Sequence, residues 1–224
     1  MTRYISFRFD DGFFVGALKA NALLAPHHGT FFIVTGLVEG THRLEHIPEF
    51  IGREFGTLES WKLLARSGHD IQPHSVTHPN LRLLTREQQV AEIAGSLAFV
   101  QKIHGGPYIF CSPYNLCPEI DFGALGFAAA GFLGSAHGLP YNDLSALNPF
   151  DLRSKVIHEE NFEWLVQELR DAIPDNAWVI IGFHSFDHEG HRPWNFDRFS
   201  QLVAEIRALD FQIENVASVV RRYV

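Results

Sequence analysis

The chain has 224 residues, of which 46% are hydrophobic and 13% aromatic, and this length and composition predict one compact α/β domain over residues 1–224. Its formal net charge of −8 is spread along the sequence, so no basic patch indicates nucleic acid or a membrane surface as a partner. Because no signal peptide, membrane-spanning apolar run or cysteine framework is recognisable, the sequence predicts a cytoplasmic protein.

Short β-rich runs alternate with amphipathic helical patterns along the sequence. Strands are expected at residues 4–9, 30–35, 70–71, 108–110, 127–132, 178–183 and 211–213. Helices are expected at residues 58–67, 85–104, 162–172 and 196–209. About seven strands separated by helices favour a parallel sheet that closes like a (β/α) barrel, in which chemistry lies where strands end and loops begin.

Two of these helices carry clear end signals. Thr85 and Gln88 fit a capping box, and the Gly-Gly-Pro run at residues 105–107 ends that helix. Thr57 is the expected N-cap of the helix at 58–67, and Gly68 is its expected stop.

The segment HSVTH, residues 74–78, places two histidines four positions apart. In a zincin helix the residue after the first histidine is a glutamate that acts as base, but here it is Ser75. Prolines flank the segment, so at most one helical turn is expected there. One turn brings His74 and His78 to the same side, which makes them a candidate metal clamp, with two hydrogen-bonded or surface histidines as the alternative.

A third ligand is expected from RFDDG, residues 8–12, which ends the first predicted strand. The neighbouring carboxylates of Asp10 and Asp11 raise each other's pKa unless a cation or hydrogen bonds offset the repulsion. A metal ion would offset it, and Gly12 lets the backbone turn sharply after the strand. Taken alone, the segment also fits an ordinary turn with helix-capping acids.

Three stretches, YISFRFDDGF, HHGTFFIVTG and SGHDIQPHSVTHPNLRLLT, follow one another in this order. Together they resemble the polysaccharide deacetylase family, also called the NodB-homology or carbohydrate esterase 4 family. They match its FDDG segment, its ATFF strand and its GHEIGNHTxxHP segment, and a weaker similarity continues through most of the chain. The resemblance implies a NodB-like fold, which is a distorted (β/α) barrel with about seven parallel strands.

By position, the resemblance implies that Asp11, His74 and His78 bind a divalent metal, usually zinc, with cobalt or another divalent ion as alternatives. Three protein ligands leave a coordination position open for catalysis. The resemblance also makes Asp10 the catalytic base that accepts a proton as water attacks an amide carbonyl. His184, which follows the apolar run WVIIGF, matches the late histidine of the family and is the expected general acid.

The third family motif, usually Arg-x-Pro-Tyr, is altered in the segment FCSPYN, where Cys111 stands in the arginine position. The resemblance implies that the backbone N–H of Tyr114 contributes to an oxyanion hole and that Pro113 and Tyr114 contact substrate. In the family the arginine orients the catalytic aspartate, which a thiol cannot do. Arg153 is the first candidate for a substitute cation, while a different substrate or lost activity are the alternatives.

The fourth family motif, normally with an Asp-Trp pair, is not recognisable between residues 132 and 156. Asp143 and Asp151 are the candidate partners of His184 in this region, but no tryptophan is present to pack against an acetyl methyl group. Phe186 is a further candidate for the wall of a substrate groove. The sequence therefore does not specify which acyl group the substrate carries.

The resulting expectation is a metal-dependent hydrolase of non-peptide carbon-nitrogen amide bonds that removes the acetyl group from an amino sugar or oligosaccharide. A hydrolase of a small amide, ureide or cyclic imide on the same scaffold is the alternative. A non-catalytic sugar- or metal-binding protein is the second alternative, although binding alone requires neither Asp10 nor His184. The sequence carries no indication of the oligomeric state.

Overall fold

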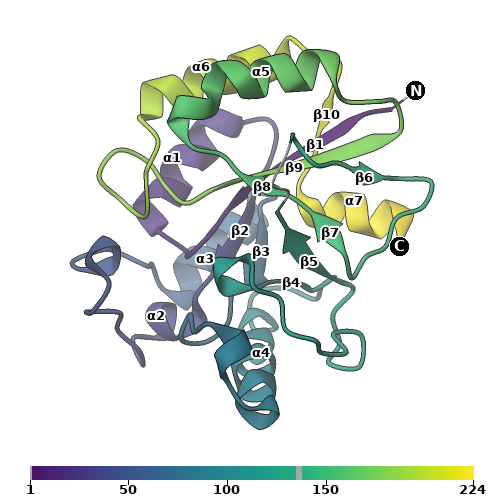
Figure 1. Cartoon of the computed structure of the whole chain (residues 1–224). Helices are drawn as coiled ribbons and strands as arrows, with labels where there is room; N and C mark the ends of the chain where they lie inside the picture. The colour runs from purple at the N-terminus through teal and green to yellow at the C-terminus, as the bar shows by residue number, and fades with distance from the viewer. Residues whose placement is uncertain (1, 135–137) are drawn as a thin grey trace.

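The structure, a computed structural model, describes residues 2–134 and 138–224, in which two β-sheets are surrounded by helices (Figure 1). The larger sheet has the order β3-β2-β1-β9-β6, with β10 also pairing with β1 and β8 with β9. Its strands are β1 (Tyr4–Phe9), β2 (Thr30–Ile33), β3 (Asp70–Pro73), β6 (Asn142–Asp143), β8 (Lys155–Val156), β9 (Ala177–Phe183) and β10 (Gln212–Ile213). The smaller sheet has the order β4-β5-β7 and consists of β4 (Ile109–Cys111), β5 (Ala129–Leu133) and β7 (Leu152–Arg153).

Among the described strands every pairing is parallel except that of β6 with β9. The side chain of Gln72 in β3 bridges the two sheets, since its Nε2 donates to the carbonyl of Pro107 at 2.9 Å and its Oε1 accepts from the N–H of Ile109 at 2.8 Å. The bridge continues the curl of the larger sheet into the smaller one. This mixed α/β half-barrel of mostly parallel strands confirms the predicted fold class.

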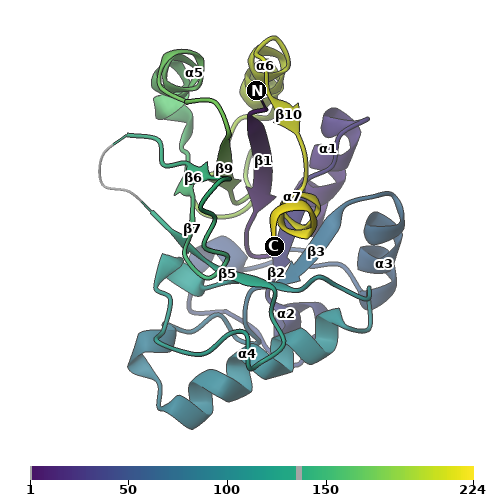
Figure 2. The same ribbon diagram turned by 90° about the vertical axis from the view of Figure 1, so that its right-hand side faces the viewer.

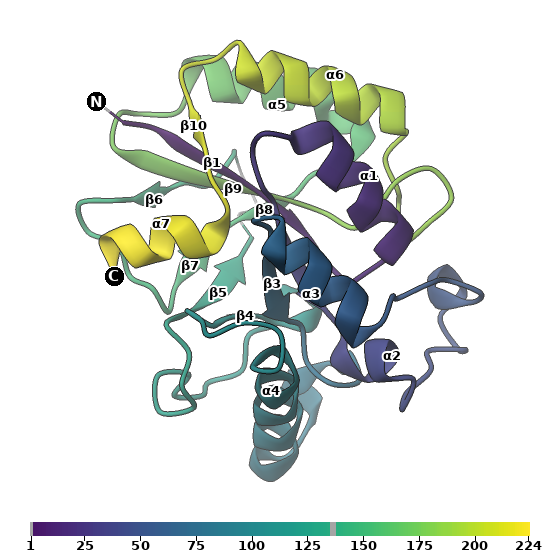
Figure 3. The ribbon, with the colours of Figure 1, turned by 180° about the vertical axis from the view of Figure 1, so that it is seen from behind.

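Helices form a layer outside the larger sheet. Helices α5 and α6 lie side by side over β1 and β9 (Figure 2), and α1 and α3 continue the layer on the side seen in Figure 3. The helices are α1 (Phe14–Leu24), α2 (Thr35–Glu39), α3 (Leu58–Arg66), α4 (Arg86–Val100), α5 (Phe162–Asp171), α6 (Phe196–Arg207) and α7 (Val216–Tyr223). Within the ranges 2–134 and 138–224, no helix has both the length and the apolar composition to cross a membrane.

The predicted helix starts are confirmed. Thr57 and Thr85 each accept a hydrogen bond from the backbone of the third helical residue, which bonds back to the cap and completes a capping box in both cases. Helix α4 ends at Val100, however, and not at His104 as predicted, because the residues between them form turns.

Strand β1 alternates between two environments, because successive side chains of a strand point to opposite faces. Ile5, Phe7 and Phe9 face the outer helices, where the rings of Phe7 and Phe9 both lie 6.0 Å from the ring of Phe199 in α6. Arg8 points to the opposite face, into the interior between the two sheets, and is fully buried there. Because residues two apart in an extended chain point to the same side, Asp10 is directed to the same side of the sheet as Arg8.

Candidate active site

Four parallel strands end at the same side of the half-barrel, and each delivers polar residues to it. Asp10 and Asp11 follow β1, His74 and His78 follow β3, and His184 follows β9, while residues 112–115 follow β4. Together they border a cavity of about 420 Å³. Its lining consists of Asp10, Asp11, Ile47, Glu49, Phe50, His74, His78, Ser112, Tyr114, Asn115, Val156, His158, His184 and His191.

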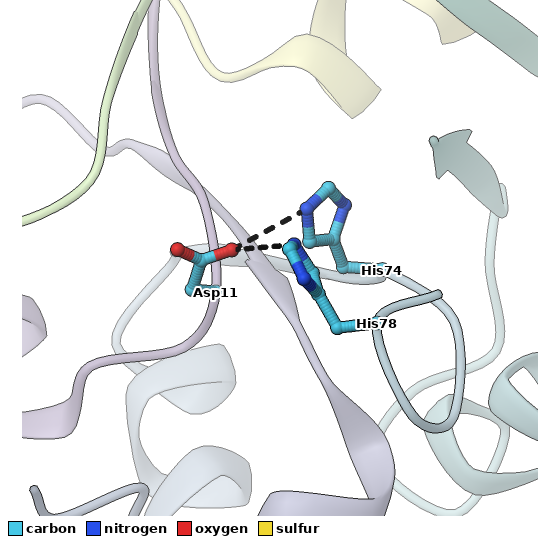
Figure 4. Close-up of side chains that lie close together, drawn as sticks. All are labelled: Asp11, His74 and His78. Atoms are coloured by element: carbon cyan, nitrogen blue, oxygen red, sulfur yellow. Dashed lines mark ion pairs between the residues drawn. The ribbon is translucent and has the colours of Figure 1, made fainter. Parts of the chain in front are cut away.

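The side chains of Asp11, His74 and His78, which all line this cavity, converge on one another (Figure 4). Oδ1 of Asp11 lies 3.5 Å from Nε2 of His74 and 3.2 Å from Nε2 of His78, and one ligand atom from each residue falls within 4.8 Å of the others. All three residues are buried. Two imidazole nitrogens and one carboxylate oxygen are a donor set that suits zinc and leaves coordination positions open.

The hydrogen bond made by the second ring nitrogen of His74 also fits a metal ligand. Nδ1 of His74 lies 2.8 Å from the carbonyl oxygen of Cys111, and since a carbonyl only accepts, Nδ1 carries the proton and Nε2 is free to donate its lone pair. Burial on its own raises the pKa of Asp11, but the charge of His78 and hydrogen bonds with both histidines hold that pKa well below its ordinary value. The site thus stabilises positive charge beside this carboxylate.

The HSVTH segment forms a loop, and the predicted helical turn is wrong. Ser75 and His78 adopt left-handed backbone conformations, with φ of 67° and 59°. Oγ of Ser75 accepts a hydrogen bond from the N–H of His78 at 3.0 Å, and this contact closes the loop. The ring centroids of His74 and His78 lie 5.2 Å apart, so a loop achieves the convergence that one helical turn was expected to give.

Asp11 shares this backbone feature, with φ of 75°, and so do Tyr114 and Asn115, with φ of 59° and 55°. A non-glycine residue in this region costs on the order of 1–3 kcal/mol, and such residues gather at functional sites where the surrounding structure holds them in place. Four of these five residues line one cavity, and Ser75 is the exception, which marks the cavity as the specialised part of the fold.

The cation beside Asp10 is Arg8. Its Nη2 lies 3.4 Å from Oδ2 of Asp10 and donates to Oδ1 of Asn115 at 3.0 Å, while its Nη1 contacts Sγ of Cys111 at 2.6 Å. Burial by itself lowers the pKa of Arg8, but Asp10 and Cys111 raise it above the ordinary value. The guanidinium therefore stays charged in the interior and touches the position at which the third family motif normally carries its arginine.

The neighbouring strands make room for this arginine. Gly182 of β9 is the cross-strand partner of Arg8, and a Cβ atom on that glycine would lie 2.7 Å from Nε of Arg8. The guanidinium carbon also sits 5.1 Å from the ring centroid of Phe132, a cation–π contact. The small thiol of Cys111 completes the space, because a longer side chain there would meet the guanidinium.

The prediction of Arg153 as the substitute cation is wrong. Arg153 lies in β7 with about half of its side chain exposed, and its Nη2 pairs with Oδ2 of Asp151 at 2.7 Å. Asp151 is thus committed to a partner outside the cavity. Asp143 is also misplaced as a partner of His184, because it pairs with Ala177 at the start of β9, whereas His184 follows the end of that strand.

The structure places the three predicted substrate-contact residues in different surroundings. Tyr114 lines the cavity, is 53% exposed, and holds its ring 4.8 Å from the ring of His78. Pro113 is buried and lies outside the described lining. Phe186 is a core residue, packed 4.8 Å from the ring of Phe199, so its prediction as a groove residue is wrong.

His184 reaches the cavity from the opposite side to the metal ligands' loop, at the end of β9. Burial lowers its pKa, although Asp11 and Asp10 act in the other direction. The ring of His191 stands edge-on at 5.7 Å, and Nδ1 of His191 lies 3.2 Å from Oε1 of Glu49. Neither Asp143 nor Asp151, the aspartates predicted as partners of His184, lines this cavity, whereas His158 and His191 do.

His158 is a cavity residue that sequence reasoning missed. It follows the two-residue strand β8, which is too short to produce a recognisable pattern in the sequence. Burial, followed by the charges of Arg192, His184 and His191, lowers its pKa to about 4, so the ring is neutral near pH 7. Its Nδ1 is buried without a hydrogen-bond partner in the described part of the chain.

Comparisons with known proteins agree with this architecture. Residues 2–119 match the family model described as polysaccharide deacetylase. A comparison with curated proteins finds no significant match. Among solved structures, the chain is similar to the Xyl-CE4 domain of a multidomain xylanase from the hindgut metagenome of Trinervitermes trinervoides, with a TM-score of 0.62 and 13% identity over 99% of this chain and 91% of that one.

Two further structures show the same fold. The peptidoglycan deacetylase PdaC from Bacillus subtilis gives a TM-score of 0.58 and 15% identity over 99% of this chain and 92% of that chain. BA3943, a CE4 family pseudoenzyme from Bacillus anthracis, gives 0.61 and 10% over 98% of this chain and 66% of that chain. Since the family model matches more than half of its length, the chain belongs to the polysaccharide deacetylase family.

Proposed function

We propose that the protein is a metal-dependent hydrolase that removes the acetyl group from an acetylated amino sugar or oligosaccharide. The observation that carries the proposal is the buried cluster of Asp11, His74 and His78, with Asp10 and His184 on the same cavity. A sugar- or metal-binding protein needs the cluster at most, whereas a hydrolase also needs groups that accept and donate protons.

Asp11, His74 and His78 would hold the metal, and zinc is the ion that best matches their donor atoms. A divalent ion there supplies a Lewis acid that activates water and polarises the amide carbonyl. Asp10 accepts the proton of the attacking water, and the ion pair with Arg8 orients its carboxylate. His184 donates a proton to the departing amine from across the cavity, after which the acetate and the free amine leave.

A hydrolase of a small amide, ureide or cyclic imide is the second candidate. The cavity of about 420 Å³ lies toward the lower end of the range for small-molecule sites, and its described apolar lining is Ile47, Phe50 and Val156, without a tryptophan. The small volume suits a small substrate, and no tryptophan among the described lining residues is placed to pack against an acetyl methyl group. The metal site and Asp10 would serve this reaction in the same way.

Turnover of two substrate sets separates these candidates. We expect the zinc- or cobalt-loaded protein to release acetate from acetylated chito-oligosaccharides, measured by an enzyme-coupled acetate assay, and to lose this activity in the presence of a chelator. Hydrolysis of cyclic imides or ureides alone would establish the second candidate. If the loaded protein turns over neither set although the metal is bound, the proposal of a hydrolase is contradicted and a binding function stands.

A further inference from the structure

The loop that carries His74 and His78 has to be held in shape by its surroundings. It contains no helix or strand, and the left-handed backbone of Ser75 and His78 is unfavourable by itself. Both histidines depend on this loop for their direction, because they stand at its two ends. The contacts that restrain its centre therefore decide where the two imidazoles point.

Glu92 of α4 makes those contacts. Its Oε2 accepts hydrogen bonds from the backbone N–H groups of Val76 and Thr77 at 2.9 and 2.8 Å, and its Oε1 accepts from Oγ1 of Thr77 at 2.7 Å. Both carboxylate oxygens are thus committed to the two residues at the centre of the loop. Hydrogen bonds to an ionised carboxylate are about twice as strong as those between neutral groups.

The opposite side of the loop is fixed by α2. The carbonyls of Ser75 and Val76 accept from the backbone N–H groups of Thr35 and Gly36 at 3.1 and 2.9 Å. The approach is close, since a Cβ atom on Gly36 would lie 2.6 Å from the carbonyl oxygen of Val76. On the α2 side the loop is held mainly by backbone N–H groups, and Oγ1 of Thr35 adds a long hydrogen bond of 3.5 Å to the carbonyl of Ser75. On the α4 side the hydrogen bonds among the described residues come from Glu92.

We propose that Glu92 is a positioning residue of the metal site, whose carboxylate holds the loop so that His74 and His78 face Asp11. The inference rests on the proposed function, in which these three residues bind the metal. Glu92 touches neither the metal ligands' imidazoles nor Asp11, and it acts through the backbone of Val76 and Thr77. Partners of this kind, which orient ligands, typically contribute 10–100-fold, as an order of magnitude, to metal affinity.

Zinc affinity of the purified full chain tests this role, measured by competition with a chromophoric chelator. We expect Glu92→Ala to weaken zinc binding about 10–100-fold. Glu92→Gln should stay within roughly fivefold of the wild type, because an amide oxygen accepts the same two N–H groups and the amide NH₂ can donate to Oγ1 of Thr77. Glu87→Ala is the matched control, since Glu87 lies in the first turn of the same helix and is exposed.

Stability is measured on the same variants by urea unfolding of the metal-free protein. A purely structural role would lower the unfolding midpoint of Glu92→Ala and leave the zinc affinity of its folded state unchanged, which would overturn the inference. If Glu92→Ala does not fold, Thr77→Val is used in its place, because it removes one of the three hydrogen bonds to Glu92. A zinc affinity of Thr77→Val equal to that of the wild type would then overturn the inference. Zinc binding that survives in Asp11→Ala would instead contradict the proposed metal site.

Discussion

Replacing Asp10 by asparagine is expected to lower the rate of amide hydrolysis by about 10²–10⁴-fold, the range that a general base contributes. Asparagine has nearly the same shape and can still accept a hydrogen bond from Arg8, but it cannot take up the proton of the attacking water. The measurement is kcat and KM of the metal-loaded variant on the substrate that the wild type turns over. The loss should appear in kcat, because Asp10 acts on the reaction and not on the binding of the ground state.

Metal content is the control for this variant. Asp10 lies beside the cluster of Asp11, His74 and His78 and is outside it, so Asp10→Asn should retain the zinc of the wild type. A variant that keeps both its metal and its full rate would remove Asp10 from the reaction. Loss of the metal from Asp10→Asn would instead indicate that Asp10 is a metal ligand.

Replacing Arg8 by methionine is expected to destabilise the protein by about 3–5 kcal/mol, because the buried carboxylate of Asp10 loses its only described cation. The rate of hydrolysis should fall as well, by roughly 10–100-fold, since the base is no longer held in one orientation. Urea unfolding and steady-state kinetics measure the two effects. Methionine keeps most of the side-chain length, so the loss of packing is small beside the loss of charge.

Arg153→Met is the matched control for this experiment. Arg153 is also an arginine paired with an aspartate, but the pair is exposed, so its removal should change the unfolding free energy by less than about 1 kcal/mol and leave the rate unaltered. The double variant Arg8→Met/Asp10→Asn should recover part of the stability lost in Arg8→Met, because no unpaired charge is left buried. Equal effects of Arg8→Met and Arg153→Met would contradict the role of Arg8.

Much of the site was predictable because it depends on local order along the chain. FDDG, HSVTH and the histidine after WVIIGF each follow an apolar, β-rich run, and the ends of parallel strands meet on one side of the fold. The alternation predicts chemistry at the strand ends, the family resemblance picks out Asp11, His74 and His184 there, and in the structure all three line one cavity. The fold class followed from the same alternation.

The partner of Asp10 was not predictable in the same way. Arg8 and Cys111 are 103 positions apart, and their contact depends on how the smaller sheet curls against β1. The sequence motif points to position 111 as the place of the missing arginine. In the structure the positive charge beside Asp10 comes instead from Arg8 in β1, the strand that Asp10 follows. Side-chain alternation in β1 was the available signal, since residues 8 and 10 point to the same face.

One helix that the sequence did not predict, α1, has weak local signals. Helix α1 begins after Phe13 without a side-chain cap, and its buried residues include small ones such as Gly16, Ala17 and Ala20. Small residues give little hydrophobic contrast between the two faces of a helix, so burial of this segment in the core decides its structure. The prediction for Phe186 failed for a related reason. A phenylalanine in a loop near a site packs in the core as often as it lines a substrate groove, and Phe186 is buried.

The zinc content of the purified chain tests the metal site most directly. After equilibration with zinc and dialysis, the wild type and His46→Ala, which changes an exposed histidine, should each retain one zinc ion per chain by mass spectrometry of the metal. Asp11→Ala and His74→Ala should retain little or none, while circular dichroism shows that both are folded. Zinc bound at the wild-type ratio in both of these variants would contradict the assignment of Asp11, His74 and His78 as the metal ligands.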